Sequence, residues 1–323
     1  MGSEYQKILE VTTRIGCSNM CEYCPQVTLI GEYRKKDPLN VINDKSDIVM
    51  SLDSFKKCLE TIPTDVDIHF AGYTEPFENP NAIDMIEHAT SKGHKVMINT
   101  TLVGMTKEVW GRLDRLDKSK LKDIHLHLPS ASYDENIGVK KPVSHIELDG
   151  FKVKELSNEY AQMLVFAIRN PVRGQSGGWA VHLHCHGDLH PQLSKVDENL
   201  KKADLPISRR DINSRAMNLL LEKKQKVPDD INIRGKCSRV SQNILLPDGR
   251  LALCCQDYGL DQIMGNLLTQ TWGEYIESDL YNQVLQEGAD LCDYCEEGIS
   301  YVDDKKWEEW RGKKKKKRKN GKS

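Results

Sequence analysis

The chain has 323 residues, 38% of them hydrophobic, and a mean hydropathy of −0.57. This composition indicates a polar, folded protein, and the length suffices for one barrel or for a large and a small domain. No apolar run approaches the roughly 20 residues of a membrane-spanning helix. The N-terminus also lacks the apolar core of a signal peptide. We therefore expect a cytoplasmic protein that does not act on membranes.

The formal net charge of −2 conceals an uneven distribution. Residues 313–323 carry eight basic and no acidic side chains. Blocks of like charge tend to stay unfolded, so residues 301–323 are expected to form a basic, disordered tail. A nucleic-acid-binding protein usually carries positive charge on its folded domain. We therefore expect nucleic acid to bind only weakly, through the tail.

The first 200 residues alternate between strand-like and helix-like segments. This order predicts a parallel sheet with helices outside it. We expect an α/β fold, a partial (β/α)6 TIM-like barrel with a connector, over residues 1–234. In such barrels the functional groups lie where the strands end. Strands are expected at 7–15, 66–71, 95–101 and 123–128, with further apolar runs of strand length at 163–169 and 179–185, and helices at 51–62, 81–92 and 106–116.

A second unit is expected to begin near residue 235. Residues 191–234 are charged and helical in character and should hold the end of the barrel and the connector. Beyond them, two strand-like segments flank Pro247-Asp248-Gly249, a sequence typical of a tight hairpin. A helix is expected at 272–286. These features predict a small α+β domain over residues 235–300.

Three cysteines follow the first expected strand: Cys17, Cys21 and Cys24. A short loop with this spacing can place three thiolates around one 4Fe–4S cube, and thiolates suit iron–sulfur clusters. Three ligands for four irons leave one iron open for another molecule. A structural zinc site is the alternative, but it usually needs four ligands, and no fourth lies nearby.

The C-x3-C-x2-C spacing, with Tyr23 before the last cysteine, resembles the motif of the radical S-adenosylmethionine (SAM) superfamily. The resemblance implies that Tyr23 contacts SAM near its adenine. It also implies that an electron from the cluster cleaves SAM into methionine and a 5′-deoxyadenosyl radical, which abstracts hydrogen from a substrate. Such an enzyme needs an electron donor such as a flavodoxin or a ferredoxin.

Further segments resemble SAM-binding motifs of the superfamily. Glu75 and Pro76 match the end of a Gly-Gly-Glu-Pro motif, although Tyr73 and Thr74 replace its glycines. The resemblance implies SAM contacts by Gly72, Glu75 and Pro76, and by Asn99 at the end of the third strand. Arg215, in Ser214-Arg215-Ala216, would contact the SAM carboxylate; the alternative is a surface arginine on a helix.

Alternating histidines mark two expected strands. His182, His184 and His186 would share one face of a strand. A metal site is possible there, but we favour a solvated strand face. We interpret His125 and His127 in the same way, although from a barrel strand they could face a substrate.

The C-terminal cysteines lie in a pattern that resembles the SPASM/twitch domain of radical SAM enzymes. The resemblance implies one auxiliary 4Fe–4S cluster held by Cys237, Cys254, Cys292 and Cys295. Cys254 fits the Gly-x4-Cys spacing better than Cys255. A four-cysteine zinc site is the alternative. The remaining Cys255 could donate a hydrogen atom to a substrate radical.

Several functions fit this pattern. We expect an oxidoreductase that oxidises an alcohol carbon of a sugar- or cyclitol-like small molecule. Alternatives are a radical epimerase of a carbohydrate-like substrate and a peptide- or protein-modifying enzyme. Cys17 lies sixteen residues from the start, which leaves no room before it for a leader-binding domain and favours a small substrate. A non-enzymatic iron–sulfur electron carrier or a structural zinc protein is the remaining alternative.

Overall fold

The computed structural model describes residues 8–36, 48–175, 177–194, 206–210 and 237–295, together with residues 196, 198, 200, 215, 216 and 218. The expected basic tail and the expected boundary near residue 235 lie outside these residues. None of the helices in the described ranges is long and apolar enough to cross a membrane.

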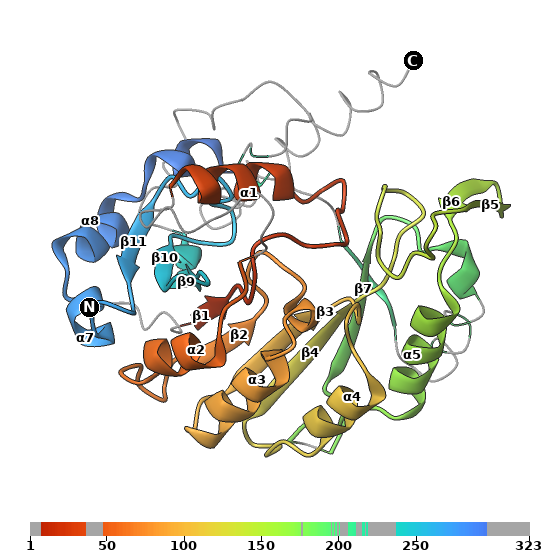
Figure 1. Cartoon of the computed structure of the whole chain (residues 1–323), viewed down its shortest axis with the longest axis horizontal. Coiled ribbons are helices and arrows are strands. Elements are labelled where there is room, and N and C mark those ends of the chain that lie inside the picture. Colours follow the sequence, from red (N-terminus) through yellow and green to blue (C-terminus); the bar gives the residue numbers. More distant parts are fainter. Residues whose placement is uncertain are drawn as a thin grey trace.

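A curved sheet of nine strands organises the fold, in the order β11-β10-β9-β1-β2-β3-β4-β7-β8 (Figure 1). Neighbouring strands from β1 to β8 in this order are parallel, as expected of six barrel strands. The sheet is open, so the predicted α/β partial barrel is confirmed. The six strands are β1 (Ile8–Val11), β2 (Asp67–Phe70), β3 (Val96–Thr100), β4 (Leu121–His127), β7 (Val181–His186) and β8 (Ser208–Arg210).

Helices follow the outer side of the sheet, and side-chain caps define where several of them begin (Figure 1). The Ser51, Thr106 and Ser157 side chains each accept a hydrogen bond from a backbone N–H of the first turn, which satisfies a donor that the helix leaves unpaired. The helices on this side are α2 (Leu52–Leu59), α3 (Ala82–Ser91), α4 (Lys107–Asp114) and α5 (Asn158–Arg169), whereas α1 (Gln26–Lys35) lies beside the C-terminal strands.

One expected strand was wrong. Residues 163–169 belong to α5, whose buried Tyr160, Met163, Leu164 and Ala167 recur at helical spacing. Between β4 and α5 the chain also forms a hairpin that the sequence did not predict, β5 (His145–Leu148) and β6 (Phe151–Lys154). Strand β8 lies in the segment that was expected to be helical.

The described residues 237–295, called the C-terminal unit below, continue the barrel sheet. β9 (Gln242–Leu245) pairs in parallel with β1. The predicted hairpin is confirmed by β9 and β10 (Arg250–Ala252), and β11 (Ile263–Asn266) lies antiparallel to β10. The helix expected at 272–286 is two helices, α7 (Trp272–Ile276) and α8 (Asp279–Glu287), because the Ser278 side chain caps a new helix. The division into two domains stays a prediction.

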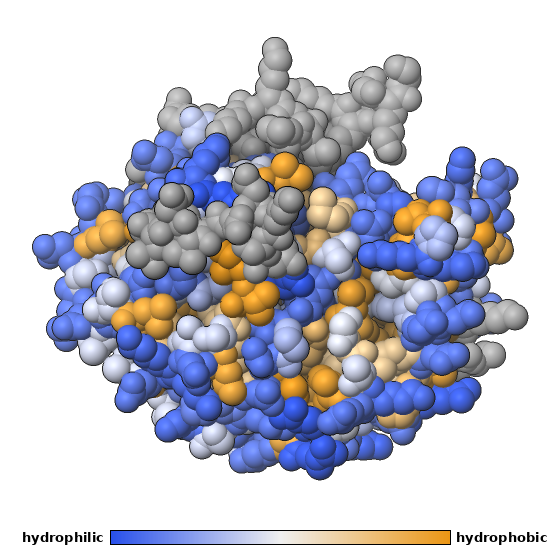
Figure 2. Space-filling model, in the orientation of Figure 1, coloured by the Kyte–Doolittle hydropathy of each residue, from blue (hydrophilic) through white to orange (hydrophobic). Residues whose placement is uncertain are grey.

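Two apolar clusters hold these parts together. The larger one fills the space between the sheet and its helices and extends into the C-terminal unit. The smaller one joins α1 to the hairpin through residues such as Leu29, Tyr33, Ile244 and Leu246. The face shown in Figure 2 is mainly hydrophilic, with apolar residues in small patches. The packing therefore fixes the C-terminal unit against the loops that follow β1 and β2.

Candidate active site

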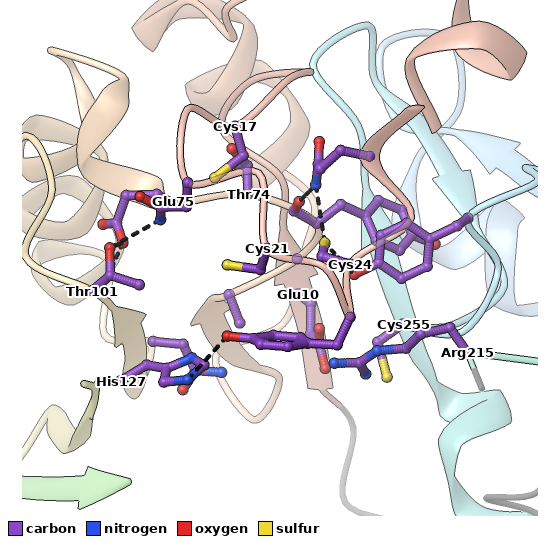
Figure 3. Close-up of a pocket in the computed structure, with 18 of the residues that line it drawn as sticks. Glu10, Cys17, Cys21, Cys24, Thr74, Glu75, Thr101, His127, Arg215 and Cys255 are labelled. Carbon is purple, nitrogen blue, oxygen red and sulfur yellow. Dashed lines mark hydrogen bonds between the residues drawn. The ribbon is translucent and has the colours of Figure 1, made fainter. Parts of the chain in front are cut away.

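A cavity of about 370 Å³ opens at the carboxyl ends of the barrel strands. It brings together side chains from the loops after β1, β2 and β3, from β4 and β7, and from the C-terminal unit (Figure 3). Parallel strands end at one edge of the sheet, so the predicted convergence of these loops is confirmed. The lining includes Glu10, Cys17, Cys21, Tyr23, Cys24, Gln26, Gly72, Tyr73, Thr74, Glu75, Asn99, Thr100, Thr101, His127, His184, His186, Arg215, Arg239, Cys255, Gln256 and Tyr258.

The N-terminal cysteine loop is anchored from several directions. The backbone N–H of Ser18 donates to the Glu78 carboxylate at 3.0 Å, and Asn19 Nδ2 donates to Thr101 Oγ1 at 3.0 Å. Cys24 N–H donates to the Cys21 carbonyl at 2.9 Å, which folds the loop into a turn. These contacts hold all three thiols on the wall of one cavity.

The chemistry of the three thiols on this cavity wall suits an iron–sulfur cluster, because thiolates are the usual ligands of such clusters. Among the described residues, no group of three His, Cys, Asp or Glu side chains is placed to hold a single metal ion. Burial raises the pKa of Cys17 to about 12 and also raises that of Cys21. Positive charge from iron would therefore be needed to hold them as thiolates.

Glu75 is buried at the edge of the cavity, where its carboxylate accepts several hydrogen bonds. Thr101 donates from its backbone N–H at 2.6 Å and from Oγ1 at 2.7 Å, and Thr100 Oγ1 donates at 2.8 Å. Burial is the larger effect and raises the pKa of Glu75 to about 7. The carboxylate therefore ties the loop after β2 to the end of β3. Pro76 begins a short 3-10 helix beside the site and does not line the cavity.

Tyr73 explains one departure from the Gly-Gly-Glu-Pro pattern. Its side chain is buried, and its hydroxyl donates to the carbonyls of Cys254 at 2.8 Å and Asp257 at 3.0 Å. Gly72 is required for a different reason: its φ is +45°, and a Cβ there would lie 2.3 Å from Thr12 Oγ1. The loop thus contacts both β1 and the C-terminal unit.

The histidine interpretation needs correction. His184 is buried, and with His127 and His186 it lines the cavity, so these rings do not form a solvated strand face. Tyr23 Oη lies 3.1 Å from His127 Nε2. His182, at the other end of β7, matches the expectation, because it is exposed and pairs with Asp123. His125 on β4 is half-buried and is not among the residues that line the cavity. The strand curves around the cavity, and sequence alternation cannot show which side faces solvent.

Arg215 and Asn99 also line the cavity. In Figure 3, the Arg215 side chain extends toward Glu10 and Cys255. Arg215 and Ala216 both have positive φ values, 52° and 50°, which cost energy for residues other than glycine. The surrounding residues therefore hold Arg215 in an unusual backbone conformation at the cavity.

Glu10, Arg239 and Gln256 line the cavity but were not predicted from the sequence. Glu10 lies between two apolar residues of β1 and is only 8% exposed. Burial raises its pKa to about 7, although the charges of Arg239 and Arg215 act in the opposite direction. A charged residue inside an apolar strand was the available signal. Nothing in the local sequence of Arg239 or Gln256 indicated a place in this cavity.

The C-terminal cysteines separate into two environments. Cys254, Cys292 and Cys295 are all buried in the main core. Cys255 instead lines the cavity, where Arg239 Nη1 donates to its sulfur at 3.5 Å. Cys237 precedes the short 3-10 helix before β9. The adjacent thiols of Cys254 and Cys255 thus face different sides of the same loop.

No protein-family model and no curated protein matches the sequence. Solved structures do match. SuiB of Streptococcus suis, bound to the precursor peptide SuiA, is 12% identical over 90% of this chain and 71% of its own, with a TM-score of 0.53. BtrN in complex with AdoMet and 2-DOIA is 17% identical over 91% and 93%, with a TM-score of 0.49. Native anSMEcpe with bound AdoMet is 11% identical over 85% and 82%, with a TM-score of 0.48.

At these identities the similarity concerns the fold. The SuiB match extends over nine-tenths of the chain. It confirms the predicted α/β fold, a mostly parallel and open sheet with helices.

Proposed function

We propose that the chain is a radical SAM enzyme that oxidises an alcohol carbon of a polar, sugar- or cyclitol-like small molecule. One observation carries the proposal. Cys17, Cys21 and Cys24 share a cavity with Tyr23 and Glu75, at the ends of the strands of a radical SAM fold. The fold alone would not identify the chemistry.

Each part of the cavity then has a role in binding. The three thiolates would hold a 4Fe–4S cluster and leave one iron for SAM. The bound cluster and SAM together supply a 5′-deoxyadenosyl radical that removes a hydrogen atom from the substrate. Tyr23 would contact the adenine, and Gly72, Glu75, Pro76 and Asn99 would shape the SAM site. Arg215 would pair with the SAM carboxylate.

The remaining lining favours a hydroxyl-bearing substrate. Glu10, His184, His186, Arg239 and Gln256 offer hydrogen-bond donors and acceptors on the wall of the cavity. Such groups would orient a polar ring rather than an apolar one. Cys237, Cys254, Cys292 and Cys295 would hold an auxiliary 4Fe–4S cluster. When the hydroxyl carbon becomes a carbonyl, this cluster would accept the electron that remains after loss of a hydrogen atom and a proton.

Epimerisation is the second candidate, because Cys255 lines the cavity beside Arg239. The thiol would donate a hydrogen atom to the substrate carbon radical. An electron from a reduced iron–sulfur cluster and a proton from solvent would restore the thiol. In this case Cys255→Ala should abolish product while 5′-deoxyadenosine formation continues. Unchanged product formation in this variant would exclude the role.

A peptide substrate is the third possibility, since SuiB is solved with a precursor peptide. The identity of 12% supports the fold and leaves the substrate open. The substrate classes can be separated by incubating the enzyme with sugars, cyclitols and peptides that carry deuterium on carbon. Deuterium in 5′-deoxyadenosine identifies the class that loses the hydrogen atom.

The primary test is anaerobic reconstitution of the wild type and a variant in which Cys17, Cys21 and Cys24 are all alanine. The wild type should bind about eight irons and the variant about four, as two 4Fe–4S clusters require. Only the wild type should form 5′-deoxyadenosine from SAM with a reductant. Tightly bound zinc, without iron or nucleoside, would refute the proposal and support a structural zinc protein. Iron without nucleoside would support an electron carrier.

A further inference from the structure

The Cys24 sulfur lies within hydrogen-bonding distance of side chains from both parts of the molecule. Gln26 Nε2 donates to Cys24 Sγ at 3.4 Å from the first residue of α1. Tyr258 Oη lies 3.5 Å from the same sulfur, although it is 234 positions away and belongs to the C-terminal unit. A thiolate bound to iron carries no proton, so Tyr258 would have to be the donor in the loaded protein.

The Tyr258 side chain is held in place by its surroundings. It is only 5% exposed and packs against the Tyr73 ring, with 4.6 Å between the ring centroids. The Tyr73 hydroxyl in turn donates to the carbonyls of Cys254 and Asp257. The Asp257 carboxylate accepts from the backbone N–H groups of Asp261 and Gln262. The loop that carries Tyr258 is thus fixed on both sides.

Hydrogen bonds to cluster sulfurs alter the reduction potential, because they stabilise the more negative, reduced form. We propose that Tyr258 is a positioning residue that donates a hydrogen bond to Cys24 and raises the reduction potential of the N-terminal cluster. This inference rests on the proposed function. It connects the C-terminal unit, through the Cys254 loop, to the site where SAM would be cleaved.

The experiment is an anaerobic redox titration of the reconstituted full-length protein, followed by electron paramagnetic resonance. SAM is added in a parallel titration, because its binding changes the signal of the N-terminal cluster and identifies it. Tyr258→Phe keeps the ring and removes the hydroxyl, so the midpoint potential should become more negative. Tyr281→Phe, which changes a tyrosine of α8 outside the cavity, should leave it unchanged.

Tyr73→Phe provides a second variant that leaves Tyr258 intact. It removes both hydrogen bonds that Tyr73 donates to the loop carrying Tyr258, so the Tyr258 hydroxyl should be held less firmly against Cys24. The midpoint potential should therefore move in the same direction as in Tyr258→Phe. If Tyr258→Phe does not retain the wild-type iron content, Tyr73→Phe decides the question.

An unchanged midpoint in a fully loaded Tyr258→Phe variant would overturn the inference and leave the proposed function standing. If Tyr258→Phe does not retain its iron, an unchanged midpoint in Tyr73→Phe would likewise overturn the inference and leave the proposed function standing. A wild type that binds no iron would overturn both.

Discussion

Tyr23 Oη lies 3.1 Å from Nε2 of His127, so a residue of the cysteine loop is hydrogen-bonded to the end of β4 across 104 positions of sequence. The two rings are also stacked, with 5.8 Å between their centroids. This contact fixes the position of the aromatic residue that precedes Cys24. His184 and His186 of β7 line the same cavity as His127.

Tyr23→Phe should therefore lower the free energy of unfolding by about 1 kcal/mol, because one buried hydrogen-bonding group is lost. His127→Gln combined with Tyr23→Phe should cost less than the sum of the two single changes, since both remove the same contact. Urea denaturation of the four proteins measures this coupling. Tyr133→Phe, which changes a ring that packs edge-on against Tyr23, serves as the control. Additive costs would mean that the hydroxyl and the imidazole do not interact.

Glu75 should make stability depend on pH. Burial raises its pKa to about 7 from an ordinary 4.5, so the folded state retains a proton that the unfolded state releases. The stabilisation is present in acid and is lost as the pH rises from about 4.5 to about 7. Between pH 5 and 7.5 the free energy of unfolding of the wild type should fall by about 2 kcal/mol more than that of Glu75→Gln, which has no titrating group at this position.

The measurement is urea denaturation at both pH values, in the same metal state for each protein. Glu108→Gln changes an exposed carboxylate of α4 and should follow the wild type. Equal pH dependence in the wild type and Glu75→Gln would show that Glu75 ionises normally.

Gly249 lies in the turn between β9 and β10 and packs against Asn266 and Leu268, at and just after the end of β11. Its φ is +82°, and a Cβ would lie 2.6 Å from Asn266 Oδ1 and from Leu268 Cγ. Gly150 has a similar φ of +80°, but a Cβ at that position would meet no atom within 4 Å. Gly150→Ala should therefore lower the free energy of unfolding only by the cost of a positive φ for alanine, about 1 kcal/mol. Gly249→Ala should cost about 2 kcal/mol more, because the neighbours must also move.

Chemical denaturation of the two alanine variants separates these terms. Equal losses would mean that Asn266 and Leu268 can move aside without cost.

Cys254 and Cys255 should differ in their effect on iron content. Cys254 is buried in the same core cluster as Cys295, whereas Cys255 faces the cavity. Cys254→Ser should therefore lower the iron content from about eight to about four per chain, and Cys255→Ser should leave it near eight. Iron and sulfide analysis after anaerobic reconstitution provides the measurement. Loss of iron from Cys255→Ser alone would reverse the assignment.

The order of the elements could largely be predicted from the sequence, because apolar periodicity, capping residues and Asp248-Gly249 act locally. The cysteine spacing likewise indicated the cluster loop, since Cys17, Cys21 and Cys24 lie within one short segment. The segment at 163–169 was predicted wrongly because a short apolar run suits both a strand and a helix, and the Ser157 cap with the spacing of Tyr160 and Met163 decided for the helix.

The sequence by itself determined the fold class and the three thiols that meet in one loop, because both depend on near neighbours along the chain. Only the tertiary structure decided which distant side chains complete the cavity. Glu10 and His184 face it because the sheet curves, and Tyr258 reaches Cys24 because β9 pairs with β1. Such contacts depend on strand pairing and packing between segments far apart in sequence, which no local pattern of residues records.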